Sequence, residues 1–165
     1  MSSIGSLIIF IVVFVLLFWV IRQMKGNEQF DERQLLGRYK ACRSGFFAFM
    51  IVIVLDAVLK LFGMTFYEDP LGELAAIFVA VLVFAGQAIR YDAFIALNTT
   101  FRYQLIVFII VCLSQLVNAI SQITSGTMIR DGRLTLSCLS ILCVITFAAI
   151  IIMMLIHQRM TQEEA

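Results

Sequence analysis

Residues 134–156 read LTLSCLSILCVITFAAIIIMMLI, a stretch without a single charged side chain. A helix needs about 20 mainly apolar residues to cross the hydrocarbon core of a bilayer. The stretch therefore predicts a transmembrane helix. Four comparable runs precede it, at 4–21, 45–63, 71–89 and 103–120. We expect an all-α integral membrane bundle of five transmembrane helices, with residues 1–165 forming a single membrane domain.

The composition indicates the same environment. Of the 165 residues, 62% are hydrophobic and 14% are charged, whereas soluble domains carry about 25% charged residues. A water-soluble fold of this size could not bury so much apolar surface, so the lipid bilayer is expected to surround the chain. The formal net charge of +1 gives no reason to expect direct nucleic-acid binding. The run 4–21 lacks the basic start and the small-residue cleavage site of a signal peptide, so we interpret it as an uncleaved anchor.

Lysine and arginine are distributed unequally between the two sides that five crossings would create. One side receives only Arg130 and Arg133, with Lys60 near the end of a run. Cytoplasmic loops carry the excess of basic residues. We therefore predict an outside amino terminus and a cytoplasmic carboxyl terminus, in a plasma or inner membrane. The cytoplasmic side would hold the other nine basic residues: Arg22, Lys25, Arg33, Arg38, Lys40, Arg43, Arg90, Arg102 and Arg159.

The polar segment 22–44 joins the first two runs on the predicted cytoplasmic side. Within it, acidic residues come before basic ones, an order that complements a helix dipole, and Asn27 could cap the helix. We expect a short interfacial helix that leads into the second span. Two interpretations stay open: a solvated linker whose basic residues touch anionic lipid, or a docking surface for a cytoplasmic protein.

Two charged residues interrupt the second run. Asp56 lies deep in the span, and Lys60 follows four residues later on the same helical face. Charged groups inside a span are rare and costly, and they often mark a function. One interpretation is an intrahelical ion pair, with Lys60 reaching the outer surface. The other makes Asp56 a proton or cation site.

The fourth run carries a stripe of amide side chains. Helical spacing places Gln104, Gln115, Asn118 and Gln122 on one face. Such a face should point into the bundle, where it would form hydrogen bonds between helices. Alternatively, Gln115 and Asn118 would line a hydrated cleft together with Asp56.

Small residues follow one face of the third run. Gly72, Ala76 and Ala80 are spaced four residues apart, a pattern that permits close helix approach. The contact would form within the subunit or between copies in a homo-oligomer. Before this stripe, Asp69 and Pro70 are typical of a helix start, with Asp69 as the cap.

Catalytic side chains are scarce in the sequence. The only histidine, His157, falls at the inner end of the last span, where we interpret it as an interfacial residue. No nucleophile–base pair, metal-ligand spacing or phosphate-binding glycine loop is apparent, so we predict no catalytic site, no cofactor and no metal. The cysteines show no ligand spacing and are expected to be free thiols: Cys42, Cys112, Cys138 and Cys143.

Three short motifs lie outside the apolar runs. Asp31-Glu32-Arg33-Gln34 with Gly37 precedes the second span, Tyr91-Asp92-Ala93-Phe94 with Leu97-Asn98 lies in the inner loop, and Ile129-Arg130-Asp131-Gly132 precedes the last span. In these motifs the chain resembles an uncharacterised family of small multi-pass membrane proteins of Gram-positive bacteria, a domain of unknown function. The resemblance covers the chain from Asn27 onward.

That family has no established activity, but its members are often encoded beside small helix-turn-helix regulators. The resemblance therefore implies a membrane partner or sensor for a transcription factor. The motif residues that would face the cytoplasm are Asp31, Glu32, Arg33, Gln34, Asp92 and Asn98.

Two functions follow as hypotheses. The first is a non-enzymatic sensor or interaction partner of a cytoplasmic protein, which would use those motif residues. The alternative is a small transporter or ion-coupled carrier, which would use Asp56 and the polar face of the fourth span. A membrane enzyme is a weaker third hypothesis, because the sequence offers no set of catalytic groups.

Overall fold

The computed structural model describes residues 30–97 and 100–163 of the chain. The described part consists of long helices, as the sequence predicts. They are α2 (Glu32–Leu61), α3 (Leu71–Arg90), α4 (Phe101–Thr124) and α5 (Leu139–Glu163). By length and composition, four helical segments in this part are able to cross a membrane. The first apolar run, 4–21, lies outside the described residues.

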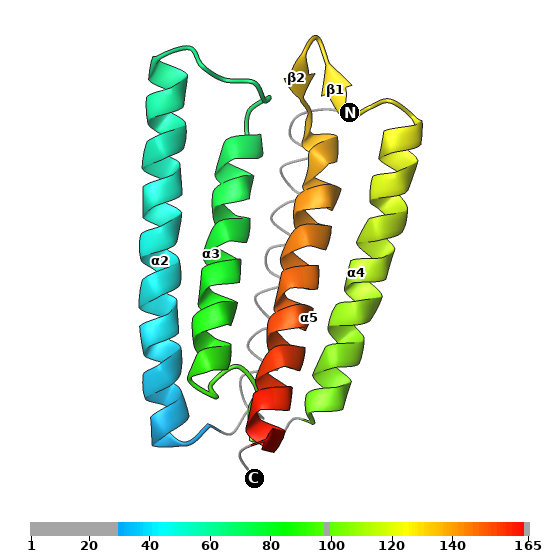
Figure 1. Ribbon diagram of the computed structural model, residues 1–165. Coiled ribbons are helices and arrows are strands. Elements are labelled where there is room, and N and C mark those ends of the chain that lie inside the picture. Colours follow the sequence, from blue (N-terminus) through cyan, green and yellow to red (C-terminus); the bar gives the residue numbers. More distant parts are fainter. Residues whose placement is uncertain (1–29, 98–99, 164–165) are drawn as a thin grey trace, which may run out of the picture.

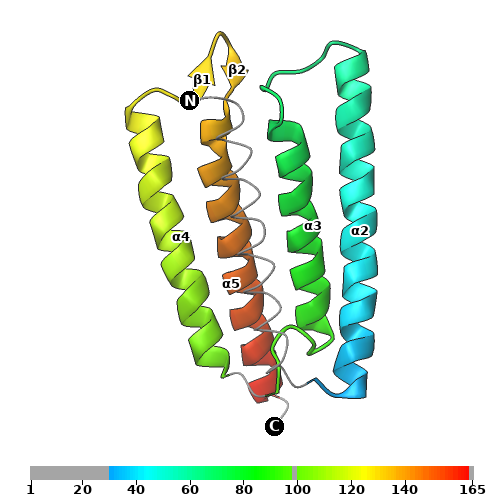
Figure 2. The same ribbon diagram turned by 180° about the vertical axis from the view of Figure 1, so that it is seen from behind.

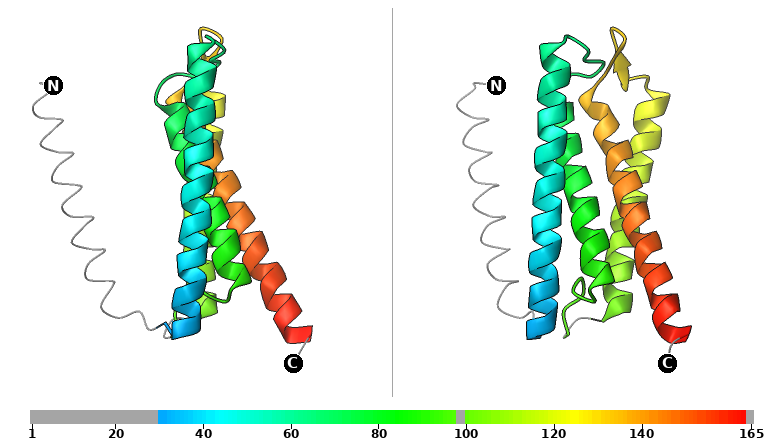
Figure 3. Two further views of the ribbon diagram at one scale, coloured as in Figure 1. Left: turned by 90° about the vertical axis from the view of Figure 1, so that its left-hand side faces the viewer. Right: turned by 60° about the vertical axis from the view of Figure 1, so that its left-hand side comes forward.

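The helices form a row in the order α2, α3, α5, α4, as Figures 1 and 2 show from opposite sides. Contacts join each helix to its neighbour in this row. Figure 3 shows that α5 crosses the others at an angle, so its carboxyl-terminal end leaves the plane of the row. Consequently α2 and α4 are the two edges of the row.

Between α4 and α5 the chain forms a tight β-hairpin. Strands β1 (Ile129–Arg130) and β2 (Arg133–Leu134) pair antiparallel, and a 3₁₀ turn, η1 (Leu136–Cys138), leads into α5. Asp131 and Gly132 at the tip both have positive φ, 51° and 74°. This is the backbone that a two-residue hairpin turn requires. We call this end of the molecule the hairpin end and the opposite end the His157 end.

Over its described residues, 30–44, the predicted interfacial helix is not a separate element. From Glu32 onward, α2 is one continuous helix that includes the second span, and Asp31 caps it. Asn27, the expected cap, lies outside the described residues. The Asp31 carboxylate accepts a hydrogen bond from the Gln34 amide at 2.6 Å. Gly37 and Gly45 do not interrupt the helix, because each allows a neighbouring segment to pack closely against it. A Cβ on Gly45 would lie 3.0 Å from the carbonyl oxygen of Ala80 on α3.

Helix α3 begins at Leu71, close to the predicted start. Pro70 occupies the capping position and no side chain caps the helix, so the expected capping by Asp69 does not occur. Where α3, α5 and α4 meet, a small core forms around Ile89, Ile150 and Met154. Phe108 on α4 packs against this core. Burial elsewhere in the row is sparse, and large apolar side chains remain exposed along all four helices.

Candidate functional site

At the His157 end, three segments far apart in the sequence meet at Asp92. The Gln34 side chain of α2 donates a hydrogen bond from Nε2 to the Asp92 carbonyl oxygen at 2.9 Å. His157 on α5 places Nε2 2.6 Å from Asp92 Oδ1. We call Asp31, Gln34, Asp92 and His157 the Asp92 cluster.

The backbone at Asp92 creates this arrangement. Asp92 has a φ of 54°, a left-handed conformation that aspartate tolerates better than most residues. The Asp92 amide donates to the Ile89 carbonyl at 3.1 Å, and the Ala93 amide donates to the Ala88 carbonyl at 2.8 Å. These bonds end α3 in a tight turn, as left-handed residues commonly do at helix ends. The turn leaves the carboxylate of Asp92 against α5 and its carbonyl against α2.

The turn after α3 also packs directly onto the first part of α2. A Cβ on Gly37 would lie 2.8 Å from the Cβ of Tyr91 and 3.0 Å from the Cβ of Ala93. Only glycine permits such a close approach, which explains why residue 37, in a stretch rich in charged residues, is a glycine. The Lys40 ammonium lies 5.6 Å from the centre of the Tyr91 ring, within reach of a cation–π interaction. The DERQ-type motif and the inner-loop motif therefore form one surface.

This surface is accessible and chemically mixed. Asp31, Glu32 and Arg33 are exposed, and Asp92 is 68% exposed at its side chain. Leu35 and Leu36 are more than half exposed beside them. Two cavities, about 260 and 490 Å³, lie next to the contact between Asp92 and His157. Both charge signs, apolar side chains and hollows are thus available at one end.

The sequence predicted three members of the Asp92 cluster, Asp31, Gln34 and Asp92, as part of a cytoplasmic group, but it did not place His157 with them. The last span ends on the same side as the inner loop, so the topology alone could have suggested the pairing with Asp92. The structure brings Gln34 and Asp92 together, whereas Glu32 and Arg33 point to the exposed surface near them. Asn98 lies outside the described residues.

At the hairpin end, Lys60 is surrounded by three carboxylates. Its Nζ lies 2.9 Å from Asp56 Oδ2, 2.6 Å from Asp69 Oδ1 and 2.6 Å from Glu73 Oε1. The intrahelical ion pair expected for Asp56 and Lys60 is present. Asp69 and Glu73 pair with Lys60 because the 62–70 connection returns the chain to the end of α2.

Tyr67 completes this group, which we call the Lys60 cluster (Asp56, Lys60, Tyr67, Asp69 and Glu73). Its hydroxyl donates a hydrogen bond to Asp56 Oδ1. That bond, with burial in addition, raises the pKa of Tyr67 to about 12. Asp56 is 7% exposed, and a Cβ on Gly72 would collide with its Oδ1. The sequence did not reveal Tyr67 as a partner, because nothing in the spacing shows the path of the 62–70 connection.

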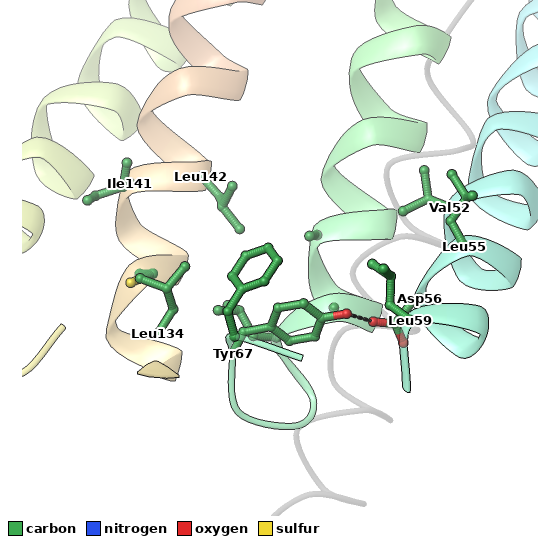
Figure 4. Close-up of a pocket in the computed structure, with 13 residues that line it drawn as sticks. Val52, Leu55, Asp56, Leu59, Tyr67, Leu134, Ile141 and Leu142 are labelled. Carbon is green, nitrogen blue, oxygen red and sulfur yellow. Dashed lines mark hydrogen bonds between the residues drawn. The ribbon is translucent and has the colours of Figure 1, made fainter. Parts of the chain in front are cut away.

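The 62–70 connection is fixed by the β-hairpin. The Leu134 amide donates to the Phe66 carbonyl at 2.9 Å, and the Glu68 amide donates to the Leu134 carbonyl at 2.8 Å. Between these bonds, Tyr67 points across to α2, as Figure 4 shows. The connection therefore links strand β2, which precedes α5, to Asp56 on α2.

Beneath this connection lies a cavity of about 450 Å³ between α2, α3 and α5. Figure 4 shows Val52, Leu55 and Leu59 on its α2 side and Ile141 and Leu142 on its α5 side. Asp56 and Tyr67 belong to the lining, which is otherwise apolar apart from Cys138.

The polar face of α4 does not join Asp56. Helix α4 is the edge of the row farthest from α2 (Figure 1). Gln115 is half-buried, Asn118 is exposed, and neither side chain has a hydrogen-bond partner among the described residues. The structure therefore does not assemble the cleft in which Gln115, Asn118 and Asp56 would act together.

The small-residue stripe of α3 packs against α2 of the same chain. Ala76 is fully buried, Gly72 faces Asp56, and the Ala80 carbonyl approaches Gly45. Of the two roles that the sequence left open, this is packing within the subunit. A contact between copies through Gly72, Ala76 and Ala80 would require α2 to move away.

Among residues 30–97 and 100–163, no group of three or more His, Cys, Asp and Glu side chains is placed to hold a metal ion. The chain matches no protein-family model, no curated protein and no solved structure. Its function must therefore be argued from the two clusters themselves.

Proposed function

We propose that this chain is a non-enzymatic multi-pass protein of the bacterial plasma membrane that binds a cytoplasmic protein through its His157 end. The contact between Gln34 and Asp92 carries this proposal, because it unites two polar motifs into one accessible surface. The bound protein would be a regulator, and the family resemblance implies a transcription factor. We also propose that the chain belongs to that family, on the basis of the motif Asp31-Glu32-Arg33-Gln34.

The distribution of basic residues supports a cytoplasmic His157 end. Among the described residues, the hairpin end and its helix termini carry Lys60, Arg130 and Arg133. Segments towards the His157 end carry a larger set: Arg33, Arg38, Lys40, Arg43, Arg90, Arg102 and Arg159. With a fifth span over 4–21, the amino terminus would then be outside.

The surface has the features of a protein-binding site rather than of a lipid-binding linker alone. A linker that only touches anionic lipid needs basic residues. Here acidic Asp31, Glu32 and Asp92 are exposed beside exposed leucines. Charge complementarity of both signs provides specificity, and apolar side chains beside it provide affinity. Such a combination fits a folded partner.

A pull-down in mild detergent at native expression tests the proposal. The variant to compare is Asp31→Ser with Glu32→Ala and Arg33→Ala, because serine keeps the helix cap while the charges disappear. A cytoplasmic protein recovered with the parent chain and lost with this variant is the expected result.

The matched control changes three charged residues at the other end, Arg130→Ala with Asp131→Asn and Arg133→Ala. These side chains are exposed on the β-hairpin, and asparagine suits the positive φ at 131. The partner should remain bound to this control. Equal recovery with both variants, at equal membrane insertion, would refute binding through the His157 end.

A further inference from the structure

The cavity beside Asp56 has the size and the wall of a ligand site. Its volume of about 450 Å³ falls within the range of roughly 300–1,000 Å³ that is usual for small-molecule pockets. Apolar side chains from α2, α3 and α5 provide most of the wall, among them Leu59, Leu71 and Leu142. An apolar molecular body would be well accommodated there.

Asp56 in the wall of this cavity belongs to a cluster that carries an excess of negative charge. Asp56, Asp69 and Glu73 surround one ammonium group, that of Lys60. Three carboxylates and one ammonium leave two negative charges uncompensated. Within the described part of the chain, the cavity lining includes no lysine or arginine, and it includes neither Asp69 nor Glu73. Of the three carboxylates, Asp56 itself faces the cavity and is nine-tenths buried.

Two aromatic rings lie beside the carboxylate. Phe66 and Tyr67 both line the cavity and pack edge to face, with ring centres 5.2 Å apart. The faces of aromatic rings carry negative partial charge and attract cations, most strongly where water is excluded. The aromatic rings and the carboxylates therefore favour the same sign of charge in a ligand.

We propose that this cavity binds a lipophilic cation, an organic molecule with an apolar body and a single positive charge. The apolar wall would take the body, while Asp56, Phe66 and Tyr67 would hold the charge. A lipophilic anion would contact the same apolar wall but would be repelled by the carboxylate of Asp56. An acyl chain from the bilayer would fill the wall without using the charge at all. The site is separate from the protein-binding surface at the His157 end.

Binding of two probes of similar shape and opposite charge tests this assignment. The probes are tetraphenylphosphonium and tetraphenylborate, measured by equilibrium dialysis on the full chain in nanodiscs, with empty nanodiscs subtracted. The parent chain should bind the phosphonium and show little binding of the borate. Equal binding of both probes, or binding of neither, would overturn the proposal.

Two variants locate the site. Asp56→Asn keeps an acceptor for Tyr67 and should weaken phosphonium binding by about tenfold, as expected on loss of a charge-assisted contact. Ala75→Phe places a ring into the lining and should abolish binding without changing any charge. Asp131→Asn on the exposed hairpin is the matched control and should bind as the parent does.

The variants are compared after each has been shown to elute as a monodisperse species with the parent's helical content. Unchanged phosphonium binding in Asp56→Asn would overturn the role of the carboxylate. If Asp56→Asn does not fold, Ala75→Phe decides the matter. Phosphonium binding that survives the filled cavity would place the probe elsewhere and overturn the proposal.

Discussion

His157 Nε2 lies 2.6 Å from Asp92 Oδ1 although the two residues are 65 positions apart. The contact ties the end of α5 to the turn that follows α3. Together with the backbone bonds between Leu134 and the 62–70 connection, it joins the α2–α3 hairpin to the α4–α5 hairpin at both ends. The row of helices is thus fastened at its two ends as well as through its sparse core.

The contact between His157 and Asp92 should contribute only modestly to stability, because the Asp92 side chain is mostly exposed. We expect a coupling free energy of about 0.2–1 kcal/mol. A double-mutant cycle with Asp92→Asn and His157→Gln, followed by unfolding in detergent, measures it. Asparagine is chosen because it tolerates the positive φ. A coupling near zero would mean that the turn holds α5 through packing alone.

Gly72→Ala should destabilise the chain, because the added Cβ would collide with Asp56 Oδ1. We expect a loss of about 1–3 kcal/mol, the usual cost of overpacking. Thermal unfolding in detergent gives the measurement.

Gly86→Ala on the same helix is the control. Its Cβ would meet only the flexible Met153 side chain, at 3.3 Å from the sulfur. Because alanine favours the helix by about 1 kcal/mol over glycine, this variant should be neutral or slightly stabilised. A Gly72→Ala variant as stable as Gly86→Ala would contradict the described position of Asp56.

Tyr67 should ionise at a higher pH than an ordinary tyrosine does. Its pKa is raised to about 12 because its hydroxyl donates to Asp56 and is partly buried. An ordinary tyrosine has a pKa of about 10. Ultraviolet absorption during an alkaline titration should therefore show one late tyrosinate, which is missing in Tyr67→Phe and retained in Tyr103→Phe.

The same shift gives stability a defined pH dependence. A pKa that is raised on folding contributes stability that is complete below the unfolded value of about 10. This contribution disappears as the pH rises through about 12. Tyr67→Phe should thus differ from the parent in stability at neutral pH and converge with it in strong alkali. A constant difference at all pH values would argue against the bond to Asp56.

Lys60→Met should lower stability more than Glu73→Gln does. Without Lys60, three carboxylates face one another unpaired, whereas without the Glu73 charge Lys60 retains Asp56 and Asp69. Thermal unfolding orders the two variants. Lys40→Met, at the other end of α2, removes the same charge without stranding a carboxylate and serves as control. The reverse order of stability would show that the ion pairs of Lys60 contribute little to the stability of the fold.

Accessibility of single cysteines tests the orientation. In a background lacking Cys42, Cys112, Cys138 and Cys143, Leu35→Cys and Ile129→Cys place one thiol at each end, and both positions are exposed. A membrane-impermeant maleimide added to intact spheroplasts should label Ile129→Cys and spare Leu35→Cys. Inside-out vesicles should give the opposite pattern. Labelling of Leu35→Cys in intact cells would invert the proposed topology.

Apolar periodicity was sufficient to predict the helices but not their grouping. Apolar runs gave α3 and α4 to within four residues at each end, whereas α5 begins five residues later and ends seven residues later than the run 134–156. The length of α2 was missed, because the polar segment 22–44 and the apolar run 45–63 were predicted as two elements. Gly37 and Gly45 lie within one helix and form close contacts in the fold. The residues that these glycines contact, such as Tyr91 and Ala80, are far away in the sequence, so no local pattern explains why glycine is needed there.

The two clusters show the same limit. Asp56 and Lys60 were paired correctly, because a spacing of four residues determines proximity on a helix. Tyr67, Asp69 and Glu73 reach Lys60 through the course of a connection, and His157 reaches Asp92 through the packing of α5 beside α3. Such contacts depend on which helices are neighbours, a property that no local pattern contains.

The bonds that fix the 62–70 connection run between main-chain atoms of Phe66, Glu68 and Leu134. Main-chain bonds do not depend on the identity of the side chains that the same residues carry. Phe66 and Leu134 nevertheless contribute side chains to the cavity wall. Substitution at either position can therefore reshape what the cavity accepts while the loop keeps its course, so ligand selectivity and architecture are free to evolve separately at this point.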